Sequence, residues 1–226
     1  MEFTTTATCR PEIIRRTYES FSTNLLNVSL GASTLYLNVD AAPEGNDPQD
    51  IIAIAKMYFR NVVANISTTP CFCQAFKWCW ERPNDDFFFH LEDDWLLLKP
   101  IDIKDLFETF NRFDDKLAVI NLRAYLEITD DRICLSPGLV KTIFAQYIVD
   151  ELDVTTNPEP QTRVTGPANR TGKNKMGYYG LQYPVQSPEI VIQDIGRPWL
   201  AKRGLQRPLS DKYVFNTWEP SRQASV

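Results

Sequence analysis

The chain has 226 residues, of which 43% are hydrophobic and 12% are aromatic, and its formal net charge at pH 7 is −5. This length and composition predict one folded α/β domain with a sizeable core. The negative charge argues against a general nucleic-acid binder, so an anionic ligand must meet local cations or a metal ion.

No segment has the pattern of a signal peptide or the roughly 18 apolar residues that span a bilayer, so a cytoplasmic location is the default expectation. The five cysteines lack the paired spacing of a zinc ribbon, and we therefore expect reduced, mostly buried thiols. These cysteines are Cys9, Cys71, Cys73, Cys79 and Cys134.

The first half of the chain alternates strand and helix patterns. Pro11 suits the first turn of a helix, and apolar residues recur at helical spacing after it. Short β-prone runs separate the helical segments. In chain order we predict a strand at 3–7, a helix at 12–26, a strand at 33–39, a helix at 51–63, a short strand at 64–67, a helix at 71–81 and a strand at 87–91.

The second half continues this alternation and then changes character. We predict a helix at 102–113, strands at 117–125 and 133–136, a helix at 139–152 and a strand at 189–194. This order is typical of a sheet with helices on both faces. Between the last two elements, residues 155–180 are basic and poor in aliphatic side chains, which favours either a lid over an anionic substrate or a plain surface loop. Residues 221–226 read as a tail.

The run FFFHLEDD, Phe87–Asp94, ends a buried strand in three acids. Such a strand places its acids at the sheet edge where open α/β sheets bind ligands. The acids repel one another, and a divalent cation with oxygen ligands would relieve the repulsion and attract phosphate. The alternative is a solvated acidic turn. The single histidine, His90, lies inside the strand and is expected to be a packing residue.

Other strand-end residues are expected at the same edge. Arg10 lies just before a helix start and could cradle a phosphate or base, or cap a surface loop. Asp40 follows the second strand, and Asp194 with Arg197 follows the last. Together with the acidic triplet they fit a nucleoside diphosphate. The chain has no Ser-His-Asp set, P-loop or GxGxxG, which argues against a hydrolase, a kinase and a dehydrogenase.

Several segments resemble a GT-A-fold, nucleotide-sugar-dependent glycosyltransferase, in the small form encoded by some large algal viruses and phages. They are TCRPEIIRRTYESF (8–21), LYLNVD (35–40), FFFHLEDDW (87–95) and IQDIGRPWLAKRGL (192–205). The resemblance implies a Rossmann-like, mostly parallel sheet with helices on both faces. It also implies a single domain at 1–220, with a nucleotide-binding part at about 1–100 and an acceptor part at about 101–220.

The resemblance also implies roles for single residues in moving a sugar from a UDP-sugar to a carbohydrate acceptor. Asp94 would bind Mn²⁺ or Mg²⁺, and Glu92 and Asp93 would hold the ribose or the metal shell. The other donor-binding candidates are Thr8, Arg10, Asp40, Arg197 and Trp199. The chain lacks a C-terminal histidine as a further metal ligand, a place that Asp194 or water would take.

The general base is open at this point. An inverting transfer, which we expect, needs a carboxylate to take the acceptor proton, for which Glu159 and Asp194 are candidates, whereas a retaining transfer needs none. Two alternatives to a glycosyltransferase remain. One is a non-catalytic nucleotide- or carbohydrate-binding module of the same fold. The other is a sugar nucleotidyltransferase, which is less favoured because no Gly-rich, Lys-bearing phosphate loop lies near the N-terminus.

Overall fold

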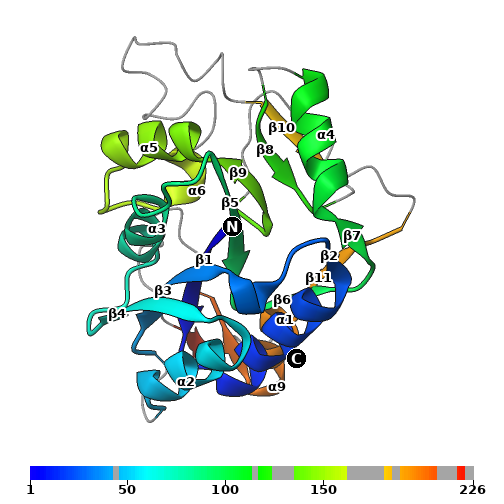
Figure 1. The fold of residues 1–226 in the computed structure, drawn as a ribbon. Coiled ribbons are helices and arrows are strands. Elements are labelled where there is room, and N and C mark those ends of the chain that lie inside the picture. Colours follow the sequence, from blue (N-terminus) through cyan, green and yellow to red (C-terminus); the bar gives the residue numbers. More distant parts are fainter. Residues whose placement is uncertain are drawn as a thin grey trace.

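The computed structural model describes residues 1–42, 46–113, 117–123, 135–161, 181–184, 189–207 and 218–221. Across these residues the chain builds a seven-stranded sheet (Figure 1). From edge to edge its strands are β10 (Leu181–Pro184), β8 (Leu117–Asn121), β9 (Gly138–Lys141), β5 (Phe87–Glu92), β1 (Glu2–Thr8), β3 (Thr34–Asp40) and β4 (Asn61–Ser67). All run in one direction except β9, which is antiparallel to both of its neighbours. The carboxyl ends of β1, β3, β4 and β5 therefore meet at one edge.

Helices cover both faces of this sheet, and each face has its own core. One face carries α1 (Pro11–Asn24), α2 (Pro48–Tyr58) and α4 (Ile103–Phe113), and the other carries α3 (Phe72–Trp80) and α5 (Thr142–Glu151). The alternation of a strand divides β5 between them, because Phe89 and Leu91 join the first core and Phe88 joins the second. The apolar run that looked uniformly buried in the sequence thus serves two cores.

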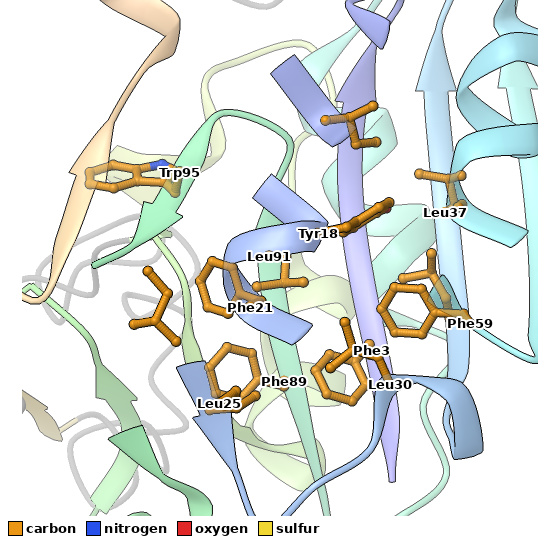
Figure 2. Close-up of a cluster of buried hydrophobic side chains, with 14 of the residues drawn as sticks. Phe3, Tyr18, Phe21, Leu25, Leu30, Leu37, Phe59, Phe89, Leu91 and Trp95 are labelled. Atoms are coloured by element: carbon orange, nitrogen blue, oxygen red, sulfur yellow. The ribbon is translucent and has the colours of Figure 1, made fainter. Parts of the chain in front are cut away.

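The core under α1 is aromatic. Figure 2 shows Tyr18 and Phe21 of α1 lying over Phe3 and Phe89 of the sheet. The Phe21 and Phe89 rings meet edge to face with centroids 6.0 Å apart. Each fully buried side chain of this size contributes about 1.5–3 kcal/mol through burial alone. Packing of this kind fixes the start of α1 against the end of β1, where Arg10 lies.

Residues 192–202, near the end of the described chain, lie beside the acidic turn that follows β5. β6 (Trp95–Leu97) directly follows the acids and pairs antiparallel with β11 (Ile192–Asp194). The short helix α9 (Gly196–Lys202) then packs on the start of α1 through Ile13, Trp199 and Leu200. The remaining short elements are β2 (Leu25–Leu26), η1 (Leu30–Ala32), β7 (Ile101–Asp102), α6 (Pro158–Gln161), β12 (Leu205–Gln206) and β13 (Glu219–Pro220).

The predicted helix at 51–63 is wrong over its last part. The α2 helix ends at Tyr58, with Phe59 in extended conformation as its C-cap, and Asn61 starts β4. The β-branched residues Val62 and Val63 belong to that strand, which pairs with β3 over seven residues. Strand pairing therefore outweighs the helical spacing of the apolar residues before it.

The predictions around residue 138 are also wrong. The predicted helix at 139–152 begins only at Thr142, because Gly138–Lys141 form β9 between β5 and β8. A Cβ added to Gly138 would lie 2.3 Å from the Ile120 carbonyl oxygen, so this backbone approach needs glycine. Of the predicted strand at 133–136, Leu135 and Ser136 are not in a strand, and the rest lies outside the described residues.

Two minor predictions are confirmed. His90 is a buried packing residue, whose Nδ1 lies 2.8 Å from Thr4 Oγ1 and 3.2 Å from Trp80 Nε1. Cys9, Cys71, Cys73 and Cys79 are buried free thiols, and Cys134 lies outside the described residues. In the part of the chain that the structure describes, no helix has the length and apolar character to cross a membrane.

Candidate functional site

A buried arginine organises the carboxyl edge of the sheet. Arg10 lies between β1 and α1, and only 3% of it is exposed. Its Nη2 donates hydrogen bonds to Asp93 Oδ1 at 2.7 Å and to Asp94 Oδ2 at 3.0 Å. Burial alone would lower the pKa of Arg10, but the two carboxylates outweigh that effect and raise it. The guanidinium therefore stays charged.

Two tryptophans flank this guanidinium. Arg10 Cζ lies 5.7 Å from the Trp199 ring centroid and 5.5 Å from that of Trp218, both within cation–π range. The indole nitrogen of Trp199 donates to Glu12 Oε1 at 2.6 Å. Trp199, a predicted donor-binding residue, is thus placed against Arg10, and it does not line the pocket described below.

Arg10 has hydrogen-bonding capacity that the described residues do not use. Its Nε and Nη1 are buried and have no hydrogen-bond partner among them. Leaving a buried donor unpaired costs about 1–3 kcal/mol, and more when the group is charged. These two donors therefore mark a place for an acceptor oxygen from outside the described structure.

Asp93 is held by the sheet itself. Its Oδ2 accepts from the backbone nitrogen of Thr8 at 3.0 Å and from Thr8 Oγ1 at 3.2 Å. Its carbonyl oxygen accepts from Thr17 Oγ1 at 2.7 Å. Asp93 and Thr8 were both predicted to bind the nucleotide sugar, and in the structure they are hydrogen-bonded to each other. Asp93 thereby positions the acidic turn beside Arg10.

Asp94 belongs to the same cluster and lies beside residues 195–207. Its Oδ2 accepts from Arg10 and lies 3.5 Å from Arg207 Nη2. A Cβ added to Gly196 would lie 2.0 Å from that oxygen, and the backbone nitrogen of Ile195 donates to the Asp94 carbonyl at 2.8 Å. The glycine in the motif IGRPW is therefore needed because the backbone passes directly over this carboxylate.

Glu92, the first acid of the triplet, is only partly buried. Its Oε2 accepts from Trp95 Nε1 at 2.8 Å. Burial, and next the charge of Asp94, raise the pKa of Glu92 to about 8, while Arg207 opposes this and Glu159 adds to it. The crowding of carboxylates expected from the sequence is thus present, with Glu159 as a further member.

These groups enclose a small pocket of about 90 Å³. Carboxylates and guanidinium groups dominate its wall. The residues that line it are Thr6, Ala7, Thr8, Arg10, Phe72, Glu92, Asp93, Asp94, Asn157, Glu159, Arg207 and Trp218. Its position at the carboxyl ends of parallel strands is the usual place for a ligand in an open α/β sheet.

The oxygen donors of this pocket fit a hard divalent cation in part. Among the described residues, no three His, Cys, Asp or Glu side chains are arranged to hold a metal ion. Mg²⁺ in proteins commonly takes one or two carboxylates, and phosphate oxygens of the substrate and water fill its other positions. Asp94 and Glu92 suit that arrangement, and it would be completed only when an anionic ligand binds.

Asp40 lies apart from the pocket. It is fully buried, and its Oδ2 accepts from the backbone nitrogen of Cys71, the N-cap residue of α3, at 3.1 Å. Its Oδ1 accepts from Asn38 Nδ2 at 3.0 Å. The carboxylate thus ties β3 to the start of α3, and its predicted role in binding the nucleotide sugar stays a prediction.

Asp194 and Arg197 also lie outside the residues that line the pocket. Asp194 Oδ1 accepts from the backbone nitrogens of Gly196 at 2.8 Å and Arg197 at 3.1 Å. Its Oδ2 lies 3.2 Å from Arg197 Nε. This carboxylate stabilises the first turn of α9, whereas Glu159, the other predicted base, reaches the pocket.

Six of the lining residues were not among the predicted site residues, and they are Thr6, Ala7, Phe72, Asn157, Arg207 and Trp218. Arg207 lies just after the segment 192–205 that carried part of the resemblance, and its charge was the one available signal. Phe72 and Trp218 read as ordinary aromatic residues, and Asn157 lies in the predicted basic loop. Of that loop, residues 155–161 are described, with the short helix α6 at Pro158–Gln161, and residues 162–180 lie outside the described part.

Comparisons with known proteins bear on the fold. No protein-family model matches the chain, and no curated protein matches it. Among solved structures, TarS from S. aureus has a TM-score of 0.53 at 11% identity, over 88% of this chain and 37% of that one. A cytidylyltransferase from Leptospira borgpetersenii has a TM-score of 0.51 at 14% identity, over 94% and 89%. The chain thus spans well under half of the TarS chain but most of the cytidylyltransferase. At such identities the likeness shows the fold, and it confirms the predicted GT-A, Rossmann-like α/β class.

Proposed function

We propose that this chain is a glycosyltransferase that binds a nucleotide diphosphate sugar, a UDP-sugar, at the Arg10–Asp94 pocket and transfers the sugar to a carbohydrate acceptor. One observation carries the proposal. A charged guanidinium, 3% exposed, has two nitrogens without a hydrogen-bond partner among the described residues, and it lines a pocket at the sheet edge where open α/β folds bind ligands. Oxygens of a diphosphate are strong acceptors for such donors.

The size and charge of the pocket suit the diphosphate part of the donor. Its volume of about 90 Å³ lies well below the roughly 300–1,000 Å³ typical of whole-ligand sites. The nucleoside and the sugar would therefore extend beyond it. Arg10 and Arg207 would together offset the negative charge that a diphosphate brings next to Asp94 and Glu92.

A divalent cation, Mn²⁺ or Mg²⁺, is part of this proposal. Asp94 and Glu92 would hold it, with Asp93 kept in place by Thr8 and Arg10. Such a cation, when bound, supplies Lewis-acid stabilisation of negative charge on the leaving diphosphate. It would also lower the repulsion that raises the pKa of Glu92.

Glu159 is the base that we assign to an inverting transfer. It lines the pocket and lies near enough to Glu92 to affect its pKa. Asp194 is occupied at the start of α9. In this role, the Glu159 carboxylate would take the proton of the acceptor hydroxyl as that oxygen attacks the sugar. A retaining transfer would not need this carboxylate.

A nucleotidyltransferase is the second candidate, and one observation favours it. The cytidylyltransferase structure matches almost its full length to almost the full length of this chain. In that reaction a phosphate oxygen of a sugar phosphate attacks the α-phosphorus of a nucleoside triphosphate, and pyrophosphate leaves. In this chain Arg10 and the acids of the same pocket would hold the phosphates. The resemblance to small virus- and phage-encoded enzymes, and the cytoplasmic location, remain predictions from the sequence.

Two measurements test the proposal. Calorimetry with UDP should show binding that Mn²⁺ strengthens, that Asp94→Ala weakens, and that a matched change of an exposed acid, Asp105→Ala, leaves unchanged. Product analysis with a panel of nucleotide sugars and glycan acceptors should detect released UDP. No UDP binding with or without metal would overturn the proposal. Pyrophosphate release from a nucleoside triphosphate and a sugar phosphate, without UDP release, would favour the second candidate.

A further inference from the structure

The strand β4 forms one edge of the central sheet. It pairs with β3 from Asn61 opposite Thr34 to Ser67 opposite Asp40, without a register shift. In the described part of the chain no other strand pairs with its outer side. Its outward N–H and C=O groups thus form a regular ladder that can accept another strand.

This edge lacks the features that usually protect an edge strand. The sequence NVVANIS contains no charged residue, proline or glycine, and those are common devices against edge-to-edge pairing. The strand at the opposite edge, β10, contains a proline, Pro184. Its pairing with β8 also has a register shift, between Leu181 and Gln182. The two edges of the same sheet are therefore unequal, and within the described part of the chain β4 is the edge without such protection.

Apolar side chains are exposed around β4. Val63 is 45% exposed and Ile66 is 36% exposed on the strand, and Met57 at the end of the neighbouring helix α2 is 66% exposed. Val63 and Ile66 point to opposite faces of the sheet, so apolar side chains are exposed on both sides of this edge, which suits a partner that covers the edge itself.

We propose that β4 pairs antiparallel with β4 of a second copy of this chain, about a two-fold axis that passes between the two Ala64 residues. This register places Asn61 opposite Ser67, which is polar against polar, and Val62 opposite Ile66, which is β-branched against β-branched. Val63 then lies opposite Asn65. Because the strand is uncharged, self-pairing brings no like charges together, although the whole chain carries a net charge of −5.

The geometry of this pairing has two consequences. A two-fold axis that continues a sheet runs perpendicular to it, so both α2 helices lie on the same face. Because Met57 lies just before the start of β4 and the paired strands are antiparallel, the two Met57 residues lie at opposite ends of the pair. The two sheets then run in opposite directions, and their carboxyl edges, with the Arg10 pockets, face opposite ways. Each pocket is complete within one copy, so dimerisation leaves ligand binding at each pocket unchanged.

Sedimentation equilibrium of the full chain over a range of concentrations tests the proposal, with Val63→Lys and Ile190→Lys as a matched pair. Ile190 is 60% exposed and lies far from β4 in the sequence, on the segment leading to β11. We expect dimers for the unchanged chain and for Ile190→Lys, and monomers for Val63→Lys with an unchanged melting temperature. A monomeric unchanged chain at every concentration, or a Val63→Lys variant that stays dimeric, would overturn the proposal.

A second variant tests the register itself. Ala64 is exposed, and on the proposed axis it faces its own copy. Ala64→Cys in a Cys134→Ser background should therefore form a covalent dimer with a short thiol cross-linker, and the Cys134→Ser chain alone should not, because its four other cysteines are buried. A dimer that does not cross-link at position 64 would refute this pairing. UDP binding by the monomeric variant is a separate readout, so failure of the dimer and failure of the proposed function can be told apart.

Discussion

The strands on either side of β1 both end in buried carboxylates, and the two ends differ in what satisfies those carboxylates. At the end of β3, Asp40 accepts from a backbone nitrogen of α3 and from Asn38. At the end of β5, Asp93 and Asp94 face Arg10, whose remaining donors have no partner among the described residues. The Asp40 carboxylate joins two elements of the fold. Asp93 and Asp94 instead bind the Arg10 guanidinium, which has hydrogen-bonding capacity that the described residues do not use. An acid at the carboxyl edge of a sheet is therefore a ligand candidate only when the group that it holds has unmet capacity.

The largest expected effect comes from removing the cation at the β5 end. Arg10→Ala leaves Asp93 and Asp94 buried without their partner, and such a loss costs about 3–5 kcal/mol in the free energy of unfolding. Urea denaturation followed by circular dichroism measures it. The control is Arg15→Ala, an exposed arginine on α1, for which we expect a change within about 0.5 kcal/mol. A similar small change for Arg10→Ala would show that the cluster does not depend on its guanidinium.

At the β3 end we expect a loss of stability without a loss of binding. Asp40→Ala removes an acceptor and leaves the buried nitrogen of Cys71 without that partner, at a cost of about 1–3 kcal/mol in the free energy of unfolding. The affinity for UDP should not change, because Asp40 is fully buried and its two oxygens already accept from Asn38 and Cys71. Weaker UDP binding by the folded variant would restore Asp40 as a ligand residue and remove the contrast between the two ends.

At the β5 end the contrast should appear in binding. Asp94→Asn keeps the size of the side chain and removes its charge, so we expect UDP affinity in the presence of Mn²⁺ to fall at least tenfold, which is about 1.4 kcal/mol. Without metal we expect no loss, since Arg10 then has one carboxylate fewer to neutralise. Isothermal titration with and without Mn²⁺ measures both values. Equal losses in the two conditions would argue against a metal-binding role for Asp94.

The smallest effect concerns the buried, uncharged part of β5. Burial lowers the pKa of His90 to about 3, below the value of about 6.5 expected in the unfolded chain. Between these two pKa values the unfolded state binds a proton at His90 and the folded state does not. The free energy of unfolding therefore falls as the pH drops below about 6.5. Between about pH 7 and about pH 5.5 this amounts to about 1 kcal/mol. His90 is the only histidine, so His90→Asn should remove this part of the pH dependence, and an unchanged slope would refute the assignment.

Much of the architecture follows from local patterns in the sequence. Pro11 at the helix start, the alternation in residues 34–40 and the aromatic run of β5 each predict the element that forms. The acids after β5 also predict the edge at which the site lies, because parallel strands bring their carboxyl ends together. Local signals fail where pairing partners decide, as for Val62 and Val63 in β4 and for Gly138 in β9.

The candidate site also has one part that the sequence predicts and one part that packing decides. The sequence by itself determined that Arg10, Asp93 and Asp94 would lie at the carboxyl edge of the sheet, since each lies just after the end of its strand. The pairing of β1 with β5 in the structure brings them together. Only the tertiary structure decided that Asp40 and Asp194 support helix starts and that Glu159, Arg207 and Trp218 reach the pocket. The physical reason is that a carboxylate takes whichever donors are nearest in space. For residues far apart in the chain, those donors are set by the packing of α3, α6 and α9 against the sheet edge.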